Sequence, residues 1–166
     1  MKPYRALCKS YERYVEDRMA YRDKAIHAVA SALAALHKHL DAPDGVCRFT
    51  PINTNLNENT EYSPQGAVDY DDDGWWSGCL LIDVSCAGVG LAKEGTLCLT
   101  ISAFVDDEIV FRVGDSDQRH RCTQIDATSL QPVIDEALSR SQEYLETGME
   151  RFLDEFSSTL SLRRWV

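Results

Sequence analysis

The stretch from Asp69 to Cys86, DYDDDGWWSGCLLIDVSC, decides the fold of this chain. Four aspartates in five residues lead through Gly74 into two tryptophans, and from Trp76 apolar or small residues recur at every second position. Because successive side chains of a strand point to opposite faces, this period predicts a β-strand with one fully apolar face. The residues on that face are Trp76, Gly78, Leu80, Ile82, Val84 and Cys86.

Further strand-like segments flank this stretch. Residues 46–50 (VCRFT) precede it, residues 96–105 and 108–113 follow it, and residues 118–125 carry a weaker pattern. Short turn sequences separate the later segments, so we expect an antiparallel β-meander of four to five strands over about residues 46–125. The long polar connection at 51–73 is expected to hold a short strand near 61–63, or to be a functional loop.

Both ends of the chain carry helical patterns. Apolar and small residues recur in steps of three and four from about residue 3 to residue 40, and again from about 128 to 160. The second helix begins with a capping box, Thr128 to Gln131, followed by Pro132. A continuous helix over 3–40 would span about 57 Å, whereas a domain of this size has a radius of gyration near ~15 Å. We therefore expect it either to break near residues 21–23 or to project and pack on a partner.

These elements predict one α+β domain over residues 1–166, in which long N- and C-terminal helices cover one face of an antiparallel sheet. The opposite face carries a mixture of polar, apolar and basic residues that we expect to be solvated or to meet a partner. Those residues are Ser77, Cys79, Leu81, Asp83, Thr100, Ser102, Arg112, Arg119 and Arg121.

The charge of the chain is unevenly distributed. The net charge is −10, with +4 in residues 1–40, −11 in residues 41–126 and −3 in residues 127–166. Phosphates would be repelled by the acidic centre, which argues against direct binding of nucleic acid. An acidic surface instead favours basic partners and can accelerate association with them.

The cysteines and the N-terminal sequence bear on location and cofactors. Six cysteines occur without a C-x-x-C pair, so we expect reduced thiols, with neither a zinc site nor a disulfide framework. The first residues are too charged for a signal-peptide core, and no apolar run approaches the ~18 residues of a membrane span. We expect a cytoplasmic protein without a cofactor and without a membrane partner.

Residues 69–74 match D-x-D-x-D-G, the opening of a calcium-binding loop. The position at which such loops carry a bidentate glutamate is occupied by Leu80, and the sequence that follows has strand periodicity. Calcium binding remains an alternative, but a solvated acidic loop explains the motif better.

The acidic run can also serve as an electrostatic recognition element. Further acidic residues at 106–108 lie in another predicted turn, and the neighbouring aromatic residues belong to types that are enriched at binding hot spots. We therefore predict a partner-binding surface made of Asp69, Tyr70, Asp71, Asp72, Asp73, Trp75, Asp106, Asp107 and Glu108.

The histidines give little indication of catalysis. His37 and His39 do not share a helical face, and no motif pairs His120 with a nucleophile. We therefore predict a non-enzymatic acidic protein that occupies a basic site on a partner, such as a nucleic-acid-binding defence protein targeted by a phage-type inhibitor. The alternatives are an acidic chaperone or adaptor that dimerises through its terminal helices, and a small enzyme that uses His120 and nearby arginines on an anionic substrate.

Overall fold

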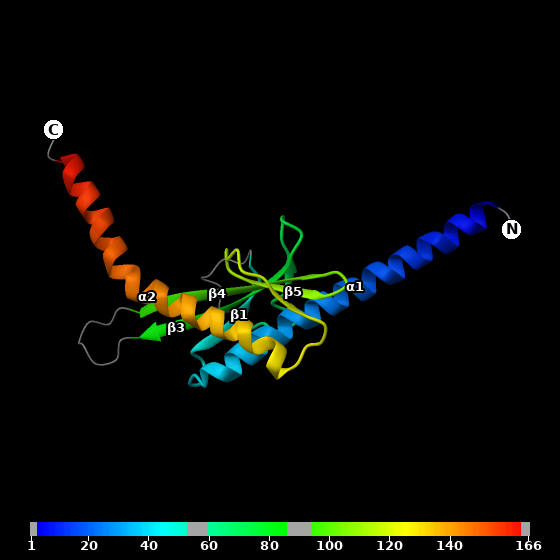
Figure 1. Ribbon diagram of the computed structural model, residues 1–166, viewed down its shortest axis with the longest axis horizontal. Helices are drawn as coiled ribbons and strands as arrows, with labels where there is room; N and C mark the ends of the chain where they lie inside the picture. The colour runs from blue at the N-terminus through cyan, green and yellow to red at the C-terminus, as the bar shows by residue number, and fades with distance from the viewer. Residues whose placement is uncertain (1–2, 53–59, 86–93, 164–166) are drawn as a thin grey trace.

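The computed structural model describes residues 3–52, 60–85 and 94–163, and it confirms the α+β fold (Figure 1). Two helices, α1 (Pro3–Leu40) and α2 (Ala127–Arg163), flank one antiparallel sheet in the sequence. Predicted residue Cys86 lies outside the described residues. The strands are β1 (Cys47–Thr50), β2 (Asp69–Tyr70), β3 (Trp76–Ser85), β4 (Glu94–Val105), β5 (Ile109–Val113) and β6 (His120–Cys122).

Strand β3 lies at the centre of the pairing. On one side it pairs with β4 along its whole length, from Trp76 opposite Ala103 to Ser85 opposite Glu94. On its other side it pairs with β1 and with the two-residue strand β2. The sheet order is β1-β3-β4-β5-β6, so the meander predicted after β3 is present. Tyr62, in the segment where a short strand was expected, forms an isolated bridge with Phe49.

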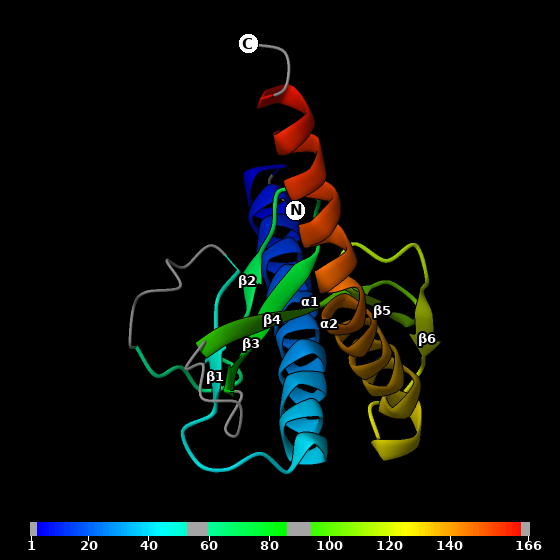
Figure 2. The same ribbon diagram turned by 90° about the vertical axis from the view of Figure 1, so that its left-hand side faces the viewer.

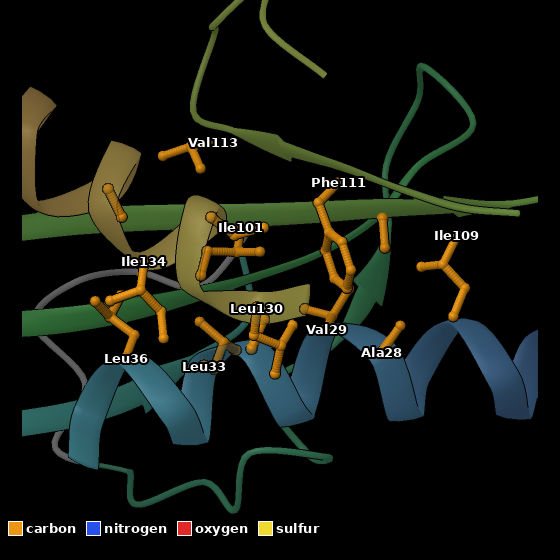
Figure 3. Close-up of a cluster of buried hydrophobic side chains, with 14 of the residues drawn as sticks. Ala28, Val29, Leu33, Leu36, Ile101, Ile109, Phe111, Val113, Leu130 and Ile134 are labelled. Atoms are coloured by element: carbon orange, nitrogen blue, oxygen red, sulfur yellow. The ribbon is translucent and has the colours of Figure 1, made fainter. Parts of the chain in front are cut away.

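Both helices cover the same face of the sheet. Helix α1 lies against β3 and β4, and α2 lies beside α1 against β5 and β6 (Figure 2). Apolar side chains from α1, α2, β4 and β5 converge between these layers (Figure 3). The labelled residues of this core are Ala28, Val29, Leu33, Leu36, Ile101, Ile109, Phe111, Val113, Leu130 and Ile134. The predicted cover of one face by two terminal helices is therefore confirmed.

Gly78 allows α1 to approach β3 closely. A Cβ atom at this position would lie 2.8 Å from Leu33 Cδ1 and 3.0 Å from the carbonyl oxygen of Ala67. Both distances are shorter than ordinary van der Waals contact, so only glycine fits between the helix and the loop. The alanine-rich part of α1 has the same effect, because Ala25, Ala28 and Ala32 are fully buried against the sheet.

The outer parts of the two helices leave the body in different directions (Figure 1). Helix α1 runs without a break, and its buried residues begin only at Ala25. Of the two outcomes expected for this helix, projection is therefore the one observed. We call residues 3–24 the α1 arm. No helix in the described part of the chain is both long and apolar enough to cross a membrane.

The sheet face opposite the helices is not fully solvated. Ser77, Cys79, Leu81 and Ser102 are buried, with at most 3% of each residue exposed. The expectation that these four residues would be solvated or meet a partner is therefore wrong. Ser77 and Ser102 hydrogen-bond to each other through their hydroxyl groups at 2.8 Å, which satisfies polar atoms that burial would otherwise leave unpaired.

Candidate partner-binding site at one end of the sheet

Antiparallel pairing brings two distant acidic segments to the same end of the sheet. Strand β3 begins at Trp76 opposite Ala103, near the end of β4, and Val105 pairs with Ile109 across the next turn. The turn before β3, residues 71–75, and the turn between β4 and β5, residues 106–108, are therefore neighbours. Both contribute residues to the predicted partner-binding surface.

Asp71 determines the shape of the first turn. One carboxylate oxygen accepts hydrogen bonds from the backbone N–H groups of Asp73, at 3.0 Å, and Trp75, at 2.8 Å. The other oxygen accepts from the Ser77 hydroxyl at 2.9 Å and lies 3.5 Å from the Arg112 guanidinium. With 13% of its side chain exposed, Asp71 is turned inward. It organises the loop, whereas Asp69, Asp72 and Asp73 remain exposed.

Trp75 lies among cationic and aromatic groups. The Arg112 guanidinium carbon is 4.6 Å from the ring centroid and that of Arg119 is 5.3 Å away, both within the range of a cation–π interaction. The Phe104 ring lies 6.0 Å from the Trp75 ring at an interplanar angle of 55°. Arg119 also donates hydrogen bonds to the backbone carbonyls of Ser116 and Gln118. These contacts hold the indole in one orientation.

A pocket of about 600 Å³ opens beside this tryptophan. We call it the Trp75 pocket, and its lining combines aromatic residues, three carboxylates and two arginines. Glu108 lies 3.6 Å from Arg121 in an exposed ion pair, while the carboxylates of Asp106 and Asp107 are exposed. The lining residues are Trp75, Phe104, Asp106, Asp107, Glu108, Val110, Arg119 and Arg121.

Tyr70 belongs to a different pocket. Its ring packs on Trp76, with centroids 5.2 Å apart, and Trp76 contacts the core beneath the helices. Because Trp75 and Trp76 are consecutive residues at the start of an extended strand, their side chains point to opposite faces of the sheet. Tyr70 and Trp76, together with α1, line a second pocket of about 570 Å³, which we call the arm-root pocket.

The nine residues of the predicted partner-binding surface therefore lie in different places: two separate pockets, the exposed surface and the inside of a turn. Trp75, Asp106, Asp107 and Glu108 share one pocket, and Tyr70 lines the other. Asp69, Asp72 and Asp73 are exposed around this end of the sheet, and Asp71 is held inside the turn. Phe104 and the arginines of the Trp75 pocket were not included in the predicted site. Strand periodicity placed Arg112, Arg119 and Arg121 on the correct face but gave no indication that Arg112 and Arg119 lie over Trp75.

The geometry of residues 69–74 favours a structural turn over a calcium loop. Among the described residues, no group of three or more His, Cys, Asp or Glu side chains is placed to hold a metal ion. The oxygens of Asp71 accept hydrogen bonds from N–H and O–H donors inside the turn, and Gly74 adopts a positive φ of 86° to close it.

His120 and its neighbouring arginines do not converge. Its Nε2 atom lies 2.5 Å from Glu136 Oε2, and this largely buried pair connects β6 to α2. Arg119 and Arg121 instead line the Trp75 pocket. The three residues proposed to act together on an anionic substrate therefore lie in two separate places.

Cys79 on β3 and Cys98 on β4 form a pair whose thiol pKa values are shifted in opposite directions. The buried Cys79 thiol hydrogen-bonds to the sulfur of Cys98, which is exposed, and this bond lowers the pKa of Cys98 from its ordinary value of 9.0 to about 7. The same hydrogen bond, with burial, raises the pKa of Cys79. An exposed thiol of low pKa is the more reactive of the two.

Comparisons of this chain with protein-family models, with curated proteins and with solved structures found no match.

Proposed function

We propose that this protein is a non-enzymatic binding protein that occupies a basic site on another protein with the acidic end of its sheet. The proposal rests on one observation. The 71–75 turn and the 106–108 turn come together at the Trp75 pocket. Asp106 and Asp107 line this pocket beside the oriented indole, and Asp69, Asp72 and Asp73 are exposed in the segment that leads to Trp75.

The pocket suits a lysine or arginine side chain of the partner. Aromatic rings attract cations through their faces, and the exposed Phe104 ring lies beside Trp75. Carboxylates at the rim can accept charge-assisted hydrogen bonds from the same cation. The fixed orientation of Trp75 reduces the conformational entropy that is lost on binding, because the indole is already held in place.

The charge of this end also indicates the kind of partner. A basic surface that normally binds nucleic acid presents arginines and lysines at close spacing, and these match a cluster of carboxylates. Occupation of such a surface would block the nucleic acid without any catalytic step. We therefore propose inhibition of a nucleic-acid-binding protein as the biological role.

A charge-neutralisation experiment tests the proposal. The acidic-end variant carries Asp72→Asn, Asp73→Asn, Asp106→Asn and Asp107→Asn. The matched control makes the same change at four exposed aspartates elsewhere: Asp41, Asp44, Asp115 and Asp117. Binding of a fluorescein-labelled oligo-arginine peptide is followed by fluorescence anisotropy from about 50 mM to about 500 mM salt.

We expect the wild type to bind more weakly as salt rises, because salt screens exposed charges. The acidic-end variant should lose about tenfold in affinity, a loss of about 1.4 kcal/mol, and the control about twofold or less. Equal losses in the two variants would show that net charge alone attracts the peptide, and that result would overturn the proposed site. Absence of binding by the wild type at low salt would overturn the proposed function.

A further inference from the structure

Strand pairing places two cysteines next to each other on the sheet face that is turned away from the helices. Cys79 of β3 lies opposite Thr100 of β4, and Cys98 of β4 lies opposite Leu81 of β3. Residues two positions apart on a strand point to the same face, so Cys79 and Cys98 are diagonal neighbours. Their sulfur atoms are hydrogen-bonded to each other. We call these two residues the thiol pair.

The two members of the thiol pair differ in their access to solvent. Only 3% of Cys79 is exposed, and its sulfur lies 3.3 Å from the Thr100 hydroxyl oxygen. Cys98 is exposed. A reagent in solution therefore reaches Cys98 directly, whereas the body of the protein shields Cys79. An accessible thiol in contact with a second, shielded thiol is the arrangement of a reactive cysteine with a resolving cysteine.

The hydrogen bond between the two sulfurs also activates the exposed one. It lowers the pKa of Cys98 to about 7 and, together with burial, raises the pKa of Cys79. Near neutral pH about half of Cys98 is therefore thiolate, the form that attacks electrophiles, while Cys79 is a protonated thiol. Burial raises the pKa of Cys47 and of Cys122, so these thiols stay protonated under the same conditions.

We propose that the thiol pair is an oxidisable dithiol, which hydrogen peroxide converts to a disulfide between Cys79 and Cys98. In the first step the Cys98 thiolate attacks one peroxide oxygen, the O–O bond breaks, hydroxide leaves with the electron pair, and Cys98 becomes a sulfenic acid. In the second step the Cys79 sulfur attacks the sulfenic sulfur, and the S–O bond breaks. The hydroxyl group leaves as water with the proton of Cys79. Two electrons pass from the sulfurs to the peroxide.

The contact between the sulfurs makes Cys79 the nearest partner for the second step. Because the two atoms already touch across one strand pairing, the disulfide can form without separating β3 from β4. A thiol reductant reverses the reaction by exchange. Neither cysteine lines the Trp75 pocket, so this proposal does not depend on the proposed function.

Peptide mapping of the full chain tests the pairing. The reduced protein is treated with hydrogen peroxide near neutral pH, and the remaining thiols are then blocked. Cleavage before Asp83 and after Lys93 places Cys79, Cys86 and Cys98 on three separate peptides. We expect the Cys79 peptide to be linked to the Cys98 peptide with the loss of two hydrogen atoms, and dithiothreitol to separate the two peptides again.

Three variants separate the two steps. In Cys79→Ser only the first step remains, so Cys98 should accumulate as a sulfenic acid that dimedone traps. In Cys98→Ser the nucleophile is lost, and oxidation of Cys79 should be at least about tenfold slower than in the wild type. The matched control, Cys122→Ser, removes a partly buried thiol of β6 and should form the disulfide at the wild-type rate.

Three results would overturn the proposal. The first is a disulfide that joins Cys98 to any cysteine other than Cys79, in the same chain or in a second one. The second is a wild-type Cys98 that stays reduced, or that stops at an acid of its own without linking to Cys79. The third is oxidation of Cys79 in Cys98→Ser as fast as in the wild type. The wild-type map alone decides the first two, so the test holds even where a variant fails to fold.

Discussion

The Asp71 carboxylate lies 3.5 Å from the Arg112 guanidinium, and 13% and 17% of the two side chains are exposed. Asp71 also accepts two hydrogen bonds within its own turn and one from Ser77 of β3, and Arg112 lies over the Trp75 ring. One aspartate therefore links the acidic turn, the buried serine pair and the aromatic centre of the proposed site.

Substitution of Asp71 should destabilise the fold, although the residue belongs to an acidic run. Asp71→Ala removes acceptors from two backbone N–H groups and from Ser77, and we expect the free energy of unfolding to fall by about 2–4 kcal/mol. Asp72→Ala, one residue away and exposed, should change it by less than about 0.5 kcal/mol. Urea denaturation of both variants measures the difference, and equal effects would show that the turn does not depend on Asp71.

Trp75 should contribute to binding through its ring. Trp75→Ala should weaken oligo-arginine binding by about fivefold to tenfold, because the aromatic wall of the pocket is lost and Arg112 and Arg119 lose the ring that they lie over. The loss should persist at high salt, where the contribution of the exposed carboxylates is screened. Trp76→Phe, on the opposite face, is the matched control and should bind as the wild type does. Normal affinity of Trp75→Ala at every salt concentration would contradict the proposed role of the pocket.

Gly78 should be intolerant of a side chain. Gly78→Ala places a methyl group 2.8 Å from Leu33 Cδ1 and 3.0 Å from a backbone oxygen, and the backbone oxygen has little room to move. We expect a loss of about 1–3 kcal/mol in the free energy of unfolding. Val84→Ala on the same strand alters an exposed position and serves as the control. An unchanged denaturation midpoint for Gly78→Ala would mean that α1 lies farther from β3 than observed.

Cys98 should react with thiol reagents at lower pH than Cys47 and Cys122. Because the thiolate is the nucleophile and the pKa of Cys98 is about 7, its rate of alkylation by iodoacetamide should rise through a midpoint near that pH. Below the midpoint the thiol is protonated and the reaction is slow. Burial raises the pKa of Cys47 and of Cys122, so these residues should react only at higher pH. Peptide mass spectrometry resolves the sites.

The hydrogen bond from Cys79 can be removed selectively. Cys79→Ala deletes the donor and should move the midpoint of Cys98 alkylation upward, toward the ordinary value of 9.0. Cys79→Ser keeps a donor at the same position and should leave the midpoint closer to that of the wild type. A midpoint that is the same in all three proteins would show that Cys79 does not set the acidity of Cys98.

Much of the fold follows from local patterns in the sequence. The alternation from Trp76 to Val84 predicts a strand with an apolar face, and the steps of three and four at each end of the chain predict two long helices. Their observed limits, residues 3–40 and 127–163, lie within a few residues of the predicted ones. Periodicity succeeds here because one face of each element must be apolar to pack against another layer.

The sequence alone determined that this chain forms helices at both ends of an antiparallel sheet, and that its acidic residues concentrate in the turns. Only the tertiary structure decided that Asp71 points inward, that two arginines lie over Trp75 and that the first half of α1 projects from the body. The reason is physical. Strand and helix periods are properties of neighbouring residues, whereas each of these features depends on side chains that approach one another only after β3, β4 and β5 have paired.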